Sequence, residues 1–412
     1  MRCFKFKIKI SIYLILISFV ASAKENDENS NRFIITNGYF ENTFNSNEGM
    51  SSFPMSIYET YDWGFRKISL DGNGVGRFFS WFLSALFQVA YLDPTYLNLT
   101  YHEFGHATRM RSFGASNVFY YVDGNFTVTA NSYFSLVINR ASYPSQSAAT
   151  SGSIPAQNSS TENSLIVTAG GMNNEILLSK NIAEKIYDRG GSVPDFAFYF
   201  MNKFGPYSYS KINPNEFQGG DPDKIETYYA NLGKNISRTD FQQAYLFSML
   251  ASGTFYSLLW GDLKYIGTGE HNISTLEIFN FSLPDFSAFI NPRGLSMETM
   301  LHYRVNKNIS LGLAYETVYK GDSYNQVSPQ IRLSSKVNGG LFRKISAKPQ
   351  LVMGFSNGLD LGGSILCEAE AETVGVFLKY TYYNKNNLYG ERNIPFIDKP
   401  HEVLGGIYFN MR

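Results

Sequence analysis

Residues 102–106 of this 412-residue chain read H-E-F-G-H, which fits the pattern H-E-x-x-H. On a helix, His102 and His106 are one turn apart and project from one face, where two imidazoles can hold one Zn²⁺. Glu103 lies beside them and can take a proton from a water that zinc activates. The pattern therefore predicts a hydrolytic zinc site with Glu103 as general base. The alternative is two surface histidines on an ordinary helix.

The residues around this motif favour a helix. Asp93 is a suitable N-cap, and Pro94 suits the first helical position. Gly114 suits the C′ position, and Arg109 and Arg111 complement the helix dipole near the C-terminal end. We therefore expect the two histidines to lie in the middle of a helix that starts near Asp93 and ends before Gly114.

Zinc in a catalytic site needs a third protein ligand and leaves one position open. Glu175, in G-G-M-N-N-E-I-L-L-S, is our first choice because a helix over 166–187 places it on an apolar stripe. The other members of that stripe are Leu178, Ile182 and Ile186. A carboxylate there is unfavourable unless it is paired or bound to a metal. The alternative is an ion pair with an arginine such as Arg109.

Five other residues are weaker candidates for the third ligand. His271, His302 and His401 are each isolated, and the last two lie in or near the C-terminal strands. Asp221 and Asp223 lie in a turn-like stretch rich in Gly, Pro and Asn.

Both stretches resemble known zinc peptidases. H-E-F-G-H-A, followed by Arg111 and by Phe113-Gly114, is similar to the motif of the site-2 protease family of intramembrane zinc proteases. That family takes an Asp as third ligand. N-N-E-I-L-L-S resembles the second helix of thermolysin-like gluzincins, in which Asn-Glu supplies the third ligand, and this implies zinc binding by Glu175. Ser179 stands where those enzymes carry an Asp that orients the first histidine. The resemblance implies a zincin in general.

The composition limits the class of protein. Lys+Arg and Asp+Glu are both 35, so the zero net charge argues against nucleic-acid binding. Charged residues make up 17% and aromatic residues 16%, and the mean hydropathy is −0.19. This combination excludes a polytopic helical membrane protein and suits a chain that meets lipid through β-strands. A basic stretch, an apolar run from Ile10 to Val20 and Ala21-Ser22-Ala23 predict a signal peptide over 1–23.

The segment 24–290 is expected to form the zincin-like domain. Arg77–Leu92 is predicted to be helical but too short for an ordinary membrane span. Val118–Ile138 is predicted to be a hairpin because Asp123-Gly124 separates two β-rich runs. Phe241–Gly261 carries no charge, and we interpret it as a buried helix rather than a membrane span.

The segment 296–412 alternates apolar and polar residues with period two over seven strands, which resembles an outer-membrane β-barrel. Leu311, Leu313, Val374, Val376 and Leu378 are expected to face lipid, and Ser310, Glu316, Lys379 and Thr381 to face inward. Since bacterial barrels usually have an even number of strands, one more strand is expected from Leu341–Ile345 or from the N-terminal region. The alternative is a soluble sheet with one wet face.

The sequence thus predicts an α+β protein, a helical zincin-like metallopeptidase domain followed by an antiparallel β-barrel-like domain. We expect an exported zinc peptidase of the bacterial cell envelope, associated with the outer membrane and acting on peptide or protein substrates. Two alternatives stay open. One is a non-enzymatic outer-membrane barrel with a structural metal site, and the other is a site-2-like intramembrane protease.

Overall fold

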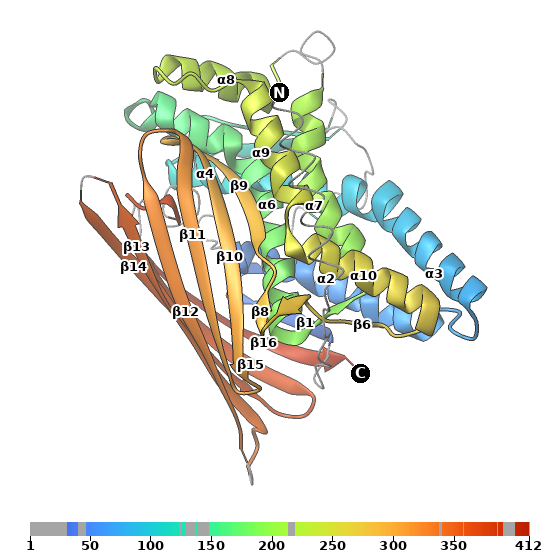
Figure 1. Cartoon of the computed structure of the whole chain (residues 1–412). Helices are drawn as coiled ribbons and strands as arrows, with labels where there is room; N and C mark the ends of the chain where they lie inside the picture. Colours follow the sequence, from blue (N-terminus) through green and yellow to red (C-terminus); the bar gives the residue numbers. More distant parts are fainter. Residues whose placement is uncertain are drawn as a thin grey trace, which may run out of the picture.

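The computed structural model of the chain describes residues 31–39, 47–122, 126–128, 137, 148–212, 219–337, 340–356, 358–384, 386–389 and 400–411. The expected signal peptide lies outside these residues. A group of helices packs against one face of a large antiparallel sheet (Figure 1). The α+β class is therefore confirmed.

The large sheet is open. Its order is β1-β16-β15-β14-β13-β12-β11-β10-β8-β7, and β9 also pairs with β10. The bounds are β1 (Asn31–Thr36), β7 (Glu277–Ile278), β8 (Phe281–Ser282), β9 (Asp285–Asn291), β10 (Gly294–Asn306), β11 (Ile309–Gly321), β12 (Asn325–Lys336), β13 (Lys344–Phe355), β14 (Leu359–Glu370), β15 (Val374–Tyr383) and β16 (His401–Met411).

The expectation of a barrel-like domain needs correction, because β1 does not pair with the β10 side of the sheet. Helices cover the two sides instead: α2 (Asn47–Ile68) packs against β1, while α6 (Thr161–Arg189) and α9 (Arg238–Leu250) pack against β9. The extra strand predicted from the N-terminal region is confirmed, since β1 pairs antiparallel with β16.

The expected boundary between 24–290 and 296–412 does not separate the sheet from the helices. Strands β1 and β9 come from the first segment but belong to the sheet. Phe289 and Ile290 of β9 and Leu295 of β10 share one buried cluster with Leu165 and Met172 of α6. The helices and the sheet are therefore parts of one packed unit.

The two faces of the sheet differ in chemistry. The expected inward residues Glu316, Lys379 and Thr381 are buried, and Leu311 and Leu378 on the other face are exposed. Every Asp, Glu, Lys and Arg within the described residues of β1 and β10–β16 has the inward orientation of the strand alternation. These are Arg32, Glu298, Arg304, Glu316, Lys320, Arg332, Lys336, Lys344, Lys348, Asp360, Glu368, Glu370, Lys379 and Glu402. The predicted division into inward-facing and outward-facing side chains is confirmed, and contact of the outer face with lipid stays a prediction.

Ion pairs connect the inner face of the sheet to α6. Arg332 lies 2.8 Å from Asp188, and Lys348 lies 3.0 Å from Glu184. Lys180 of α6 lies 2.6 Å from Glu298 of β10. Between α6 and the sheet is a polar cavity of about 250 Å³. Because a buried charge is costly without its partner, these pairs fix the position of α6 on the sheet.

The helix that carries the H-E-x-x-H motif continues directly from the preceding helical segments. Helix α3 (Gly74–Phe87) runs through a π-helical segment, η2 (Gln88–Leu97), into α4 (Asn98–Ser112). Asp93 therefore lies inside helical structure and is not an N-cap, which corrects the expected start. Phe241–Gly261 is not one helix, because α9 ends at Leu250 and a separate helix, α10 (Gly253–Thr268), begins at Gly253.

The remaining α-helices and short strands lie outside the large sheet. They are β2 (Val118–Val122), β3 (Phe126–Val128), β4 (Ala148–Gly152), β5 (Gly191–Ser192), α7 (Asp195–Lys211), α8 (Asp221–Asn231) and β6 (Asn272–Ile273). Strands β2 and β3 pair antiparallel, so the predicted hairpin is confirmed as far as Val128, while Asp123-Gly124 and most of the part after Val128 lie outside the described residues. Strand β4 pairs with the other side of β2.

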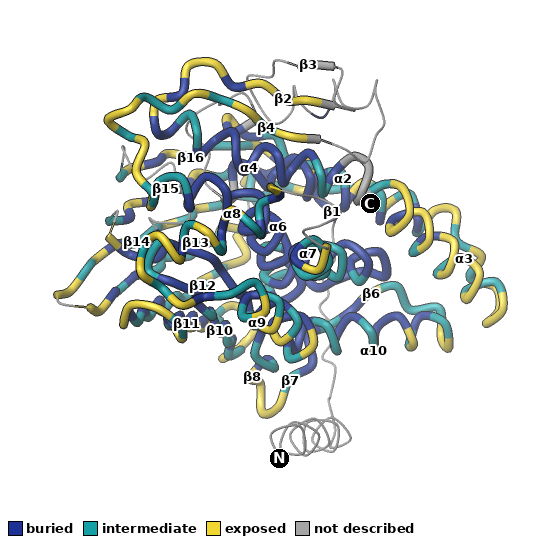
Figure 2. The backbone as a smooth tube through the Cα atoms, turned by 90° about the horizontal axis from the view of Figure 1, so that it is seen from above, coloured by how far each residue is buried: buried dark blue, intermediate teal, exposed yellow. Residues whose placement is uncertain are grey.

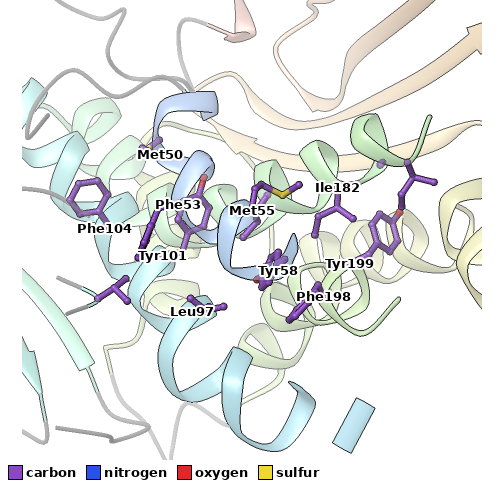
Figure 3. Packing of buried hydrophobic residues seen from close by; sticks show 14 of the residues in the cluster. Met50, Phe53, Met55, Tyr58, Leu97, Tyr101, Phe104, Ile182, Phe198 and Tyr199 are labelled. Carbon is purple, nitrogen blue, oxygen red and sulfur yellow. The ribbon is translucent and has the colours of Figure 1, made fainter. Parts of the chain in front are cut away.

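A buried apolar cluster packs α4 against α2 and α7. Tyr101 and Phe104 of α4 are fully buried together with Met50 and Tyr58 of α2 and Phe198 of α7 (Figure 3). Seen from above, α4, α6 and α7 form the buried centre of the helical layer, while α3 is largely exposed (Figure 2). The motif helix is therefore packed into a buried part of the helical layer.

Candidate metal centre

The H-E-x-x-H residues lie in the middle of α4, as predicted. His102, Glu103 and His106 are each 6% exposed, and the imidazole ring centroids of the two histidines are 4.9 Å apart. Gly114 adopts a φ of +88°, which agrees with the predicted C′ position. The two histidines therefore present neighbouring imidazoles from one face of a buried helix.

Helices α4 and α6 approach closely at glycine positions. A Cβ on Gly105 would lie 2.5 Å from the carbonyl oxygen of Gly170. A Cβ on Gly171 would lie 2.3 Å from Nε2 of His102. Only glycine leaves room for this crossing, which places the G-G-M-N-N-E segment against the H-E-x-x-H segment.

Three ligand-type atoms converge beside α4. The Asp221 carboxylate oxygen Oδ2 lies 3.1 Å from Nε2 of His102 and 3.1 Å from Nε2 of His106. Two atoms bound at about 2.0–2.1 Å to a tetrahedral ion lie about 3.3 Å apart. The spacing and the His₂-carboxylate donor set therefore fit a Zn²⁺ ion, and His102, His106 and Asp221 form the candidate metal group.

Glu175 has a different position from the one expected. Its Oε1 lies 2.7 Å from Nδ1 of His102, on the opposite side of the ring from Nε2. Its Oε2 accepts a hydrogen bond of 3.0 Å from the Asn98 side chain. A carboxylate at Nδ1 fixes the tautomer that leaves Nε2 free to bind a metal. We therefore assign Glu175 to the orientation of His102 and move the third-ligand hypothesis to Asp221.

The apolar stripe of α6 is otherwise as predicted. Glu175 is 3% exposed, and Leu178, Ile182 and Ile186 are fully buried. The Arg109 guanidinium, named above as the alternative partner, donates hydrogen bonds to Asn174 Oδ1 and to the Gly105 carbonyl. The stripe thus indicated correctly that the Glu175 carboxylate needs a partner, and that partner is His102.

His106 is oriented in the same way by the backbone. Its Nδ1 lies 2.7 Å from the carbonyl oxygen of Val167 in α6, so this nitrogen carries the hydrogen and donates it. Nε2 of His106 faces Asp221 at 3.1 Å and can bind a metal once it has lost its proton. Both histidines therefore have Nδ1 engaged by the protein and Nε2 turned toward the candidate metal position.

Asp221 reaches the site from the first position of α8. Its backbone N–H donates to the Tyr209 hydroxyl over 3.1 Å, and the Tyr209 ring packs edge-on against His102 at 5.6 Å between centroids. The segment Gly220-Asp221-Pro222 carries a helix-start signal, with Pro near the first position. That signal could have predicted α8, but the distance of 115 residues from His106 hides which residues it meets.

The electrostatics of the three groups are coupled. Burial lowers the pKa of His102, but hydrogen bonds to Asp221 and Glu175 outweigh burial and raise it well above its ordinary value. Burial raises the pKa of Asp221, yet the charges and hydrogen bonds of His106 and His102 hold it well below its ordinary value. The carboxylates therefore favour positive charge at the place where a cation would sit.

A residue of strand β4 contacts Glu103 and orients its side chain. The Thr150 hydroxyl of β4 lies 2.6 Å from Glu103 Oε2 and 3.0 Å from the Glu103 carbonyl oxygen. The carboxylate is buried, and its negative charge contributes to the raised pKa of Tyr209 and of Tyr120. Glu103 lies outside the group of three candidate ligands.

The other candidates do not join the site. Asp223 pairs with Arg238 on the α8–α9 side. His271 lies 2.9 Å from Asp71, and His302 stacks on Tyr187 at 3.8 Å between ring centroids. His401 lies 2.6 Å from the Tyr380 hydroxyl at the end of β16.

Comparisons of the chain with protein-family models, with curated proteins and with solved structures found no match.

Proposed function

We propose that the protein is a zinc-dependent peptidase of the zincin type, in which His102, His106 and Asp221 hold the metal. The observation that carries this proposal is the convergence of two Nε2 atoms and one carboxylate oxygen at 3.1 Å beside a buried H-E-x-x-H glutamate. A zinc ion there would supply Lewis acidity, which lowers the pKa of a water and polarises a carbonyl group.

The residues around this group have separate roles. Glu103 takes a proton from the attacking water and gives it to the leaving amine. Glu175 and the Val167 carbonyl hold the histidine rings in place. Tyr209 is our candidate for stabilising the oxyanion, because burial first and the Asp221 charge next raise the pKa of its hydroxyl, which therefore keeps its proton to donate.

A structural metal site is the competing interpretation. Structural zinc is almost always closed by four protein ligands, whereas catalytic zinc keeps one open position. Among the residues that the structure describes, the metal group contains three ligand residues. Glu103 adds a buried carboxylate outside the ligand group, as a general base in a hydrolytic zinc site requires. Both observations favour catalysis.

Metal removal tests this proposal on the unmodified protein. The purified chain is expected to hold one zinc per molecule by elemental analysis and to cleave members of a peptide library. A chelator such as 1,10-phenanthroline should abolish cleavage, and added Zn²⁺ should restore it. One zinc per molecule without cleavage of any peptide would assign the site to structure. Cleavage that a chelator does not affect would remove the metal from the reaction.

We further propose that the outer face of the sheet contacts lipid and places the peptidase at a bacterial envelope membrane, the outer membrane being our choice. That face carries large apolar residues that are at least one third exposed. They include Leu311, Leu313, Tyr315, Leu333, Leu351, Leu361, Ile365, Val376, Leu378, Tyr380, Val403, Ile407 and Phe409. The charged residues lie on the inner face and the apolar residues on the outer face. A sheet with its outer face in water has polar residues there, whereas a sheet that faces lipid has apolar ones.

Leu378→Arg tests the lipid-facing proposal. Leu378 lies near the middle of β15, points outward and is 55% exposed. In a water-exposed sheet the substitution should change the free energy of unfolding by about 0.5 kcal/mol or less. In a bilayer, arginine near the midplane should destabilise the protein by about 2–4 kcal/mol. The measurement is reversible urea unfolding of the chain in phospholipid vesicles.

Ser335→Arg is the matched control, because Ser335 also faces outward but lies at the end of β12, opposite Ile345. An arginine near the membrane interface should cost about 0–1 kcal/mol. Equal effects at the two positions, or a protein that remains soluble without detergent or lipid, would contradict a lipid-facing sheet.

A further inference from the structure

Helix α3 shows the same reversal of polarity as the sheet, on another part of the surface. Its large exposed side chains are apolar and recur at helical spacing. They are Val75, Phe78, Phe79, Phe82, Leu83, Leu86 and Phe87, which are 42–68% exposed. The neighbouring helix α10 adds the exposed side chains of Trp260 and Leu263. The exposed faces are visible as the yellow stretches of α3 and α10 in Figure 2.

The polar side chains of the same helix point into the protein. The Arg77 guanidinium donates to the carbonyl oxygens of Ile266 and Gly267 in α10. The Trp81 indole N–H donates to Asp262 over 2.7 Å.

The C-terminal half of the helix continues this polar stripe. The Ser84 hydroxyl lies 3.1 Å from the Tyr61 hydroxyl. The Gln88 amide, just beyond α3, donates to the Pro194 carbonyl. The spacing 77, 81, 84 and 88 places these groups on one stripe opposite the apolar one.

A helix on the surface of a soluble protein has the opposite arrangement, with its apolar stripe inward and its polar stripe in water. Gly74–Leu92 is long and apolar enough to be a candidate membrane span, and only 11% of it is buried inside the protein. Burial in a protein core therefore does not explain its composition. Nineteen helical residues extend about 28 Å, which is close to the roughly 30 Å of a hydrocarbon core.

We infer that the exposed face of α3, together with the adjoining face of α10, is a second lipid-contacting surface, and that its occupant is the acyl chains of a bilayer. A second copy of the chain could cover one apolar patch, but two separate surfaces with the same reversed polarity have one common explanation in lipid. The sheet and this helical wall then embed the molecule from different sides. This inference does not depend on peptidase activity.

A spin label at Leu83 tests this inference. The full chain with Cys3→Ser, Cys367→Ser and Leu83→Cys is labelled with a nitroxide and reconstituted in vesicles of phosphatidylethanolamine and phosphatidylglycerol. Its collisions with oxygen, which concentrates in acyl chains, are compared with those of a water-soluble nickel chelate. We expect the ratio of oxygen to nickel accessibility at Leu83 to exceed that at the control by at least about tenfold, because oxygen partitions into the apolar phase and the chelate does not.

Ala230→Cys in the same background is the matched control, because Ala230 is a small exposed residue near the C-terminal end of α8. A Leu83 label with the nickel accessibility of the Ala230 label would overturn the inference, as would a chain that does not float with the vesicles. Dipolar broadening between labels, with low accessibility to both reagents, would assign the face to a second copy and would equally overturn it. Zinc content is measured on the same samples, so failure here is distinguishable from failure of the proposed peptidase.

Discussion

Replacing Glu103 by glutamine is expected to lower the rate of peptide cleavage by about 10²–10⁴-fold, the usual contribution of a positioned general base. Glutamine has the same shape and can still accept the hydrogen bond from Thr150, so the fold is expected to persist. Zinc content should stay at one per molecule, because Glu103 is outside the ligand group. The measurements are kcat/KM on a cleaved peptide and elemental analysis of the same sample.

Glu162→Gln serves as the control for the charge change, because Glu162 is an exposed residue in the first turn of α6. That variant should cleave at the wild-type rate. If the Glu103 variant also keeps wild-type activity, Glu103 is not the base and the peptidase mechanism proposed above is wrong. If it loses zinc together with activity, the Glu103 carboxylate belongs to the metal shell.

Replacing Asp221 by asparagine is expected to cause the largest loss of zinc affinity. The substitution removes the anionic oxygen that faces both Nε2 atoms at 3.1 Å, while keeping the shape of the side chain. Glu175→Gln should weaken binding by about 10–100-fold, the effect typical of a partner that orients a ligand. The Asp221 variant should lose more than that. Competition with a zinc-binding dye measures both dissociation constants.

Asp223→Asn is the matched control for Asp221. It lies two residues further along, in the same first turn of α8, and pairs with Arg238 rather than with the histidines. Its effect on the helix dipole is therefore similar, and its zinc affinity should equal that of the wild type. A loss of zinc that is larger for the Glu175 variant than for the Asp221 variant would restore Glu175 as the third ligand.

Residue types and their spacing were enough to predict the local features of this protein. H-E-x-x-H defines the two imidazoles and the neighbouring carboxylate, because helical spacing alone places His102 and His106 on one face. Period-two alternation predicted which residues of β10–β16 face inward, because side chains in a strand alternate strictly. The apolar stripe through Glu175 showed that this carboxylate needs a buried partner, since an unpaired one is costly.

Tertiary structure alone decided which distant residues meet. Glu175 and Asp221 both lie far from His102 along the chain, and no local pattern says which reaches Nδ1 and which faces Nε2. That choice depends on the close crossing of α4 and α6 at glycine positions and on where α8 begins. The sequence did not decide whether the sheet closes, for the same reason. Strand β1, near the N-terminus, pairs with β16, near the C-terminus, and helices α6 and α9 pack against β9 on the far side of the sheet. Non-local packing sets these contacts, and alternation or spacing within one segment carries no information about it.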